Sequence, residues 1–207
     1  MKKPAHAHAL AAAAAALAAP LFAHAHHAMD SALPGSLFEG LISGLAHPVI
    51  GLDHFLFVLA IGAACCLSGG RIAAAALFVA ATVAGTVLHL YTASIAYPDV
   101  WVAASLVALG IAFFGGRRFM RSRWAFALFA LAGIAHGYAY GEAIVGAEAT
   151  PLLAYLVGFA LVQVAVIAGA YAATRALSVR LPGAPGASVL GGALSLAGVA
   201  FLALALG

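Results

Sequence analysis

Residues His47 to His54 read HPVIGLDH and place two imidazoles and a carboxylate in an apolar part of the chain. A charged side chain near the centre of a bilayer costs at least about 2.5–3.5 kcal/mol on insertion scales, so ionisable residues inside a membrane usually line a pathway or a site. Histidine and aspartate are also good ligands for borderline divalent metals. This octapeptide therefore predicts a metal site or a metal pathway, with His47, Asp53 and His54 as candidate ligands.

The spacing within the octapeptide limits how one ion could be bound. His47 and His54 are seven residues apart, which puts them on nearly the same face of a regular helix but about 10 Å apart along its axis. Both imidazoles would have to approach an ion to about 2.0–2.1 Å. Pro48 favours a helix start and Gly51 tolerates unwinding. Two arrangements remain open: a broken turn that folds His47 over Asp53 and His54, or two successive sites along a path.

Two further histidines and a glutamate extend the candidate site. His89 and His136 lie, like His47 and His54, in predicted membrane segments rather than in loops. His136 belongs to the segment GIAHGYAYGEA, where Glu142 supplies a carboxylate that would offset the charge of an arriving cation. The same segment carries a stripe of small residues that allows close helix packing: Gly133, Gly137 and Gly141.

The composition indicates the class of protein in which these residues lie. The chain has 207 residues, of which 66% are hydrophobic and 7% charged. A soluble domain of this size would carry more surface charge, and the apolar runs do not alternate as barrel strands do. We therefore predict an all-α, polytopic helical bundle in the lipid bilayer. No nucleic-acid partner is expected, and Cys65 and Cys66 are expected to be small buried thiols.

The N-terminus has the pattern of a secretory signal peptide. Two lysines precede an apolar stretch that is too short to span a membrane, and Ala23-His24-Ala25 is a small-residue cleavage site. Cleavage there makes residues 1–25 the signal peptide and residues 26–207 one transmembrane domain; cleavage after Ala23 and an uncleaved anchor are the alternatives. His26, close to the new N-terminus, would join the free amine as a candidate metal ligand.

Six apolar segments follow, each long enough to cross about 30 Å of hydrocarbon. They are expected at residues 45–67, 72–96, 99–116, 123–146, 150–176 and 187–206. Before them, Ser36 to Gly44 is expected to form a short interfacial or re-entrant helix, because Pro34-Gly35 precedes it.

The arginines predict the orientation of these segments. All of them fall in the loops after the first, third and fifth segments or at the segment ends beside these loops: Arg71, Arg117, Arg118, Arg121, Arg123, Arg175 and Arg180. The positive-inside rule makes these loops cytoplasmic, so both termini of the mature chain are expected in the periplasm of a bacterium, with the protein in the inner membrane. This orientation places the four membrane histidines and Glu142 in the outer half of the bundle.

The signal peptide, the six spans and two motifs together resemble the HupE/UreJ family over essentially the whole mature chain. The motifs are H-x5-D-H at His47–Asp53–His54 and H-G-x-A at His136–Ala139. The resemblance implies a nickel, sometimes cobalt, permease that serves hydrogenase or urease, with cytoplasmic nickel chaperones as candidate partners. The family's second motif runs H-G-x-A-H-G-x-E. This chain has Tyr140 in place of the second histidine and Glu142 one residue early, which removes one candidate ligand and could mark a different metal preference.

Two functions from different classes account for the histidines. The first is a permease that imports Ni²⁺ or Co²⁺ from periplasm to cytoplasm, with the ion as transported substrate rather than cofactor and with no catalytic residue. The chain has no Walker-type loop, so it is not ATP-driven by itself. The alternative is an intramembrane hydrolase, in which three histidines and an aspartate hold Zn²⁺ and a water molecule is the nucleophile.

Overall fold

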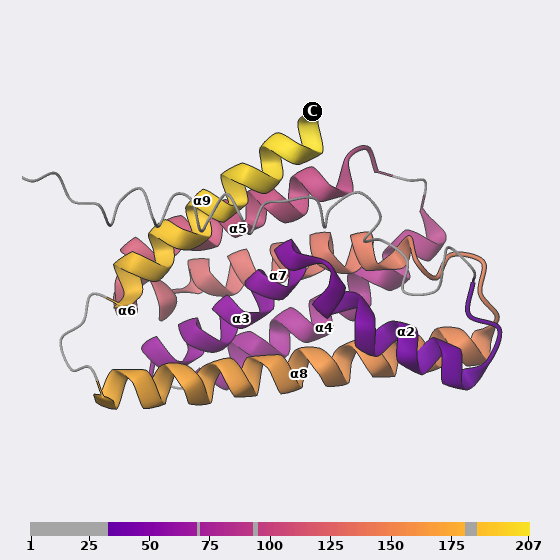
Figure 1. Ribbon diagram of the computed structural model, residues 1–207, viewed down its shortest axis with the longest axis horizontal. Helices are drawn as coiled ribbons and strands as arrows, with labels where there is room; N and C mark the ends of the chain where they lie inside the picture. The colour runs from indigo at the N-terminus through magenta and orange to yellow at the C-terminus, as the bar shows by residue number, and fades with distance from the viewer. Residues whose placement is uncertain (1–32, 70, 93–94, 181–185) are drawn as a thin grey trace, which may run out of the picture.

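The computed structural model describes residues 33–69, 71–92, 95–180 and 186–207 (Figure 1). The predicted signal peptide and His26 lie outside the described residues. Within them every regular element is an α-helix, which confirms the all-α prediction. The helices are α2 (Leu37–Ile50), α3 (Leu52–Leu67), α4 (Ile72–Tyr91), α5 (Pro98–Phe114), α6 (Gly116–Met120), α7 (Arg123–Gly141), α8 (Ala149–Arg180) and α9 (Gly186–Leu206).

The first predicted span, residues 45–67, is wrong as a continuous helix. The expected short helix at Ser36 to Gly44 instead continues to Ile50, and α2 and α3 meet at an angle of 80°. Ser36 begins α2 firmly, because its hydroxyl accepts a hydrogen bond from Glu39 N at 3.2 Å while the Glu39 carboxylate accepts one from Gly35 N at 2.7 Å. Pro48 lies inside α2, where its missing N–H weakens the last turn and favours a break shortly after it.

The number of candidate membrane spans in the described residues is three to four rather than clearly six. Helices α4, α8 and α9 are each long and apolar enough to cross a membrane, and the bent pair α2–α3 can make a fourth. Helix α5 is apolar but has only 17 residues. Helix α7 has 19 residues but is less apolar, because it includes a histidine, two tyrosines and three glycines, and it is not among the candidate spans. The structure thus supports a helical membrane protein, while six full spans remain a prediction.

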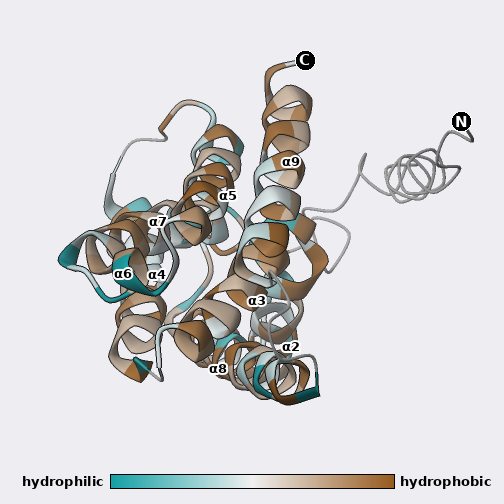
Figure 2. Ribbon diagram, turned by 90° about the vertical axis from the view of Figure 1, so that its left-hand side faces the viewer, coloured by the Kyte–Doolittle hydropathy of each residue, from teal (hydrophilic) through white to brown (hydrophobic). Residues whose placement is uncertain are grey.

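Figure 2 shows that hydrophobic residues predominate along the helices, as in proteins that face lipid. Leu131, Leu161 and Leu196 are all largely exposed. Inside, α4 packs along α7, α5 along α9, and the two parts of the bent pair along α8. These pairings leave the histidine-bearing helices α3 and α7 next to α5, which is the arrangement that builds the site.

The predicted glycine stripe on α7 is confirmed as a packing surface. A Cβ atom at Gly133 would lie 2.6 Å from Cβ of Ala81, and a Cβ at Gly137 would overlap the backbone oxygen of Thr82. From the other side, a Cβ at Gly85 would overlap the backbone oxygen of Ile134. The backbones of α4 and α7 are therefore in direct contact at these glycines, with no side chain between them.

Candidate metal site

The break between α2 and α3 shapes the first part of the site. A Cβ atom at Gly51 would lie 2.8 Å from Cδ2 of His54 and 3.3 Å from Oδ1 of Asp53. Both side chains therefore fold back over the break, and only a glycine leaves them room. Oδ1 of Asp53 also accepts a hydrogen bond from His54 N at 2.8 Å, so the carboxylate lies against the positive N-terminal end of α3, where negative charge is stabilised.

The break also brings His47 back towards His54. The centroids of the two rings are 6.3 Å apart, well below the separation of about 10 Å along the axis of an unbroken helix. His47 is half-buried and His54 buried. Of the two arrangements considered from the sequence, the structure has the broken helix with His47 folded over His54.

A chain of hydrogen bonds connects His54 to two other helices. Nδ1 of His54 lies 2.9 Å from Nδ1 of His136 on α7, and Nε2 of His136 lies 3.0 Å from Oγ of Ser105 on α5. The Ser105 hydroxyl also lies 2.7 Å from the backbone oxygen of Val102. All three side chains are buried. The chain thus joins α3, α7 and α5 at one point inside the bundle.

The tautomers along this chain can be assigned from the single proton of the Ser105 hydroxyl. We assign it to the shorter bond, so that Ser105 donates to Val102 O and accepts from Nε2–H of His136. Nδ1 of His136 is then unprotonated and accepts from Nδ1–H of His54. Nε2 of His54 is consequently the basic nitrogen of the group. A ring that donates one N–H to a fixed acceptor while its other nitrogen is basic has the usual arrangement of a metal-ligating histidine.

Aromatic rings enclose the histidine pair. The His136 side chain has an exposed fraction of 0%, and its ring centroid lies 4.5 Å from that of Phe57 and 5.7 Å from that of Phe78. The two phenylalanine rings stack on each other at 5.3 Å and are themselves fully buried. The side of the site that leads deeper into the bundle is therefore closed by apolar rings.

Tyr140 is a member of the site that the sequence analysis had counted only as the loss of a ligand. Its ring lies 4.5 Å from that of His54 and 5.2 Å from that of His47, centroid to centroid, and the side chain is fully buried. Within the described residues its hydroxyl has no hydrogen-bond partner. Ser105 was missed as well, although a hydroxyl in the middle of an apolar segment was a signal that could have pointed to it.

The structure does not bring the remaining predicted ligands to this point. His89 is buried between α4 and α7, where its ring packs on Tyr138 at 4.2 Å. Glu142 is exposed at the C-terminal end of α7. Among the described residues, no group of three or more histidine, cysteine, aspartate or glutamate side chains is placed to hold an ion. The residues that do come together are His47, His54, His136 and Tyr140, with Asp53 at the helix break.

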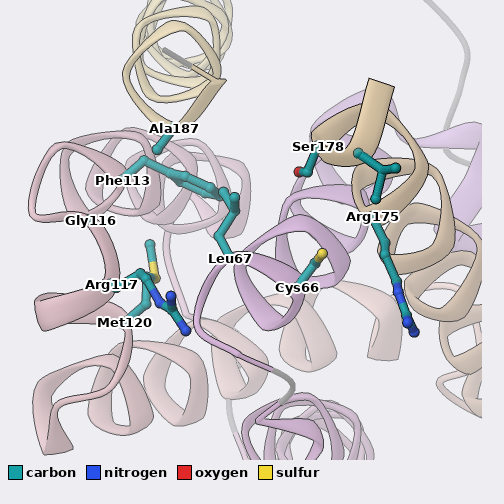
Figure 3. A pocket seen from close by; sticks show the side chains of 10 residues that line it. Cys66, Leu67, Phe113, Gly116, Arg117, Met120, Arg175, Ser178 and Ala187 are labelled. Carbon is teal, nitrogen blue, oxygen red and sulfur yellow. The ribbon is translucent and has the colours of Figure 1, made fainter. Parts of the chain in front are cut away.

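The other end of the bundle gathers the basic residues. A cavity of about 380 Å³ there is lined by Arg117, Arg175 and Cys66, among others (Figure 3). Arg71 donates a hydrogen bond to the backbone oxygen of Arg121, which joins two of the arginine-bearing loops. The neighbouring thiols differ, since Cys65 is buried and Cys66, which lines the cavity, is half-buried.

A helical bundle with apolar outer faces, a broken first helix and a buried histidine pair defines a membrane protein with a polar centre. The chain belongs to the HupE/UreJ family, because the model of that family, described as HupE / UreJ protein, matches residues 10–201. The family comprises membrane accessory proteins linked to the handling of nickel and cobalt. No curated protein and no solved structure matches the chain significantly.

Proposed function

We propose that this protein is a permease that imports a divalent transition metal, Ni²⁺ or Co²⁺, through the bacterial inner membrane for the assembly of hydrogenase or urease. Membership of the HupE/UreJ family supports the class of function. The observation that carries the proposal is the orientation of His54. A buried imidazole, held by His136 and Ser105 so that Nε2 is basic, lies beside a carboxylate at a helix break.

An arriving ion would meet these groups in order. His47 is half-buried and lies on the α2 side of the break, Asp53 offers a carboxylate, and Nε2 of His54 is the deepest ligand. Imidazole nitrogen suits Ni²⁺ and Co²⁺, and the carboxylate offsets part of the charge of the ion. His136, with both ring nitrogens in hydrogen bonds, is a positioning residue in this proposal rather than a ligand. Binding must be strong enough to remove water and weak enough to release the ion.

Passage beyond His54 requires movement of the aromatic rings below it. Phe57 and Phe78 close that side in the present conformation. Gly51 lies at the junction between α2 and α3, where a small change of backbone angles would tilt one helix relative to the other. Broken helices that line a site near the middle of the membrane are a common device in secondary transporters. The gradient of the ion, or a coupled ion, would drive the movement.

The direction of import follows from the proposed topology. The arginine end of the bundle is assigned to the cytoplasm by the positive-inside rule. Six spans after a cleaved signal peptide put both termini in the periplasm. Ions leaving at the arginine end would be taken up by cytoplasmic nickel chaperones, which keep the free concentration inside low.

The test is uptake of radiolabelled Ni²⁺ into proteoliposomes, with Co²⁺ and Zn²⁺ as competitors. His54→Ala and Asp53→Ala should abolish uptake while the protein remains inserted and abundant. Ionisable side chains such as these are unfavourable inside a membrane, so we expect them to serve function rather than folding. His89→Ala is the matched control, since it removes a buried histidine whose ring packs on Tyr138, and it should retain most of the uptake. Uptake by His54→Ala at the wild-type rate would mean that the octapeptide is structural.

The same preparation distinguishes transport from zinc-dependent hydrolysis. A hydrolase must keep its catalytic Zn²⁺, held by several protein ligands, through purification. A permease exchanges its ion quickly. Stoichiometric zinc in the purified protein, retained after mild chelation, would favour the hydrolase and contradict the permease.

A further inference from the structure

Two buried tyrosines beside the histidines differ in how their hydroxyls are satisfied. Tyr155, on α8, donates a hydrogen bond to the backbone oxygen of Tyr140 at 2.8 Å. Tyr140 itself has an exposed fraction of 0%, and its hydroxyl has no partner in the described part of the chain. A hydroxyl that is buried without a partner has lost its hydrogen bonds to water and gained nothing in return. Phenylalanine would fill the same volume without that cost.

The ring that carries the unpartnered hydroxyl packs against the histidines as well as within an apolar cluster with Tyr155 and Phe159. The ring of Tyr140 is next to those of His54 and His47, at 4.5 Å and 5.2 Å between centroids. Tyr140 is also one helical turn after His136 on α7, so the same helix supplies the positioning histidine and this hydroxyl. The tyrosine whose hydroxyl is desolvated without a partner therefore lies beside the histidines at which, under the proposed function, an ion binds.

We propose that the Tyr140 hydroxyl is a specificity-determining member of the ion site and hydrogen-bonds to a water molecule that the bound ion retains. The proposal rests on the proposed function, since it needs an ion at His54. A neutral phenol can donate to or accept from such a water. The contact is available only to an ion that keeps part of its hydration shell beside few protein ligands. It therefore favours hydrated Ni²⁺ and Co²⁺ over Zn²⁺, which prefers four ligands in a tetrahedral arrangement.

The test compares Tyr140→Phe with Tyr155→Phe in the purified full-length protein. Each variant removes one hydroxyl from a fully buried ring, but within the described residues only the Tyr155 hydroxyl has a hydrogen-bond partner to lose. The melting temperature of metal-free protein should rise in Tyr140→Phe and fall in Tyr155→Phe. In titrations with Ni²⁺, Co²⁺ and Zn²⁺, Tyr140→Phe should bind Ni²⁺ and Co²⁺ about three- to tenfold more weakly, the range expected for one hydrogen bond. Its affinity for Zn²⁺ should change less.

Several results would overturn the proposal. A melting temperature that falls in Tyr140→Phe as it does in Tyr155→Phe would show that the hydroxyl has a structural partner. Wild-type affinity for Ni²⁺ in Tyr140→Phe, or an equal loss for all three ions, would remove its role in specificity. His54→Ala, titrated in parallel, separates the two proposals. If His54→Ala loses Ni²⁺ binding and Tyr140→Phe does not, only the role of Tyr140 fails. Wild-type Ni²⁺ binding by His54→Ala, or no binding by wild-type protein, would overturn both.

Discussion

Nδ1 of His54 lies 2.9 Å from Nδ1 of His136, directly below the break between α2 and α3. Two imidazoles in direct contact can share only one proton, and with Ser105 assigned as the acceptor from Nε2–H of His136, that proton comes from His54. The basic nitrogen that remains belongs to His54. In this assignment a serine on α5 selects the tautomer of His54 in the octapeptide.

The hydrogen-bond chain predicts that Ser105→Ala, although it removes a single oxygen atom, lowers both the stability of the protein and its affinity for Ni²⁺. The substitution leaves Nε2–H of the buried His136 without an acceptor, which should lower the free energy of unfolding by about 1–3 kcal/mol. Removal of groups that orient a metal ligand typically weakens metal binding by about 10- to 100-fold. Thermal unfolding and Ni²⁺ titration measure the two effects.

Ser195→Ala is the matched control for that prediction. Oγ of Ser195 is buried without a hydrogen-bond partner in the described residues. Its removal should leave stability unchanged or raised and Ni²⁺ affinity unchanged. Equal behaviour of the two variants would mean that Ser105 does not hold His136.

The helix break predicts that Gly51→Ala weakens ion binding without unfolding the protein. The new methyl group would lie 2.8 Å from Cδ2 of His54 and would displace that ring from its present position. Nickel uptake should fall at least about tenfold, as expected when a metal-binding side chain, here His54, is no longer held in position. Gly192→Ala on α9, where nothing lies within 4 Å of the added atom, should retain uptake and gain up to about 1 kcal/mol from helix propensity. Wild-type uptake by Gly51→Ala would show that the His54 ring need not lie against the break.

The distribution of arginines predicts the topology. A reporter fused after Gly207 should score as periplasmic, and one inserted between Arg118 and Arg121 as cytoplasmic, because basic loops stay inside. The measurement is a pair of fusions active on opposite sides of the membrane, such as an exported phosphatase and a fluorescent protein. A cytoplasmic C-terminus would contradict the parse into six spans.

Proton competition predicts the effect of external pH. Imidazole must be unprotonated to bind a metal, and the free side chain titrates near about pH 6.5, which lies within the range of external pH tested. Initial uptake at low Ni²⁺ should therefore fall as the external pH decreases from about 7 to about 5.5, and higher Ni²⁺ should partly restore it. The internal pH is clamped during the measurement. An uptake rate that rises on acidification would indicate proton-coupled import instead, with Asp53 or Glu142 as candidate proton carriers.

The sequence by itself determined the class of protein and the approximate position of its polar centre. Both follow from local properties of the sequence. A long run of apolar residues predicts a membrane helix, and a carboxylate with two imidazoles inside such a run carries a free-energy cost of insertion that marks a functional position. The break within the octapeptide was also open to prediction, since Pro48 and Gly51 each act on the backbone of their own turn. The exact end of α2 was not, because α2 packs along α8, which lies far away in the sequence, and continues to Ile50.

Only the tertiary structure decided which polar residues meet. The sequence grouped His89 and Glu142 with the octapeptide, whereas the fold turns His89 towards Tyr138 and brings Ser105 and Tyr140 to His136 and His54. A soluble amphipathic helix shows from its pattern which face is buried. The helices here are apolar on nearly every face, so their rotation about their own axes is set by glycine contacts such as those between α4 and α7. Those contacts join residues far apart in the chain, and no local pattern records them.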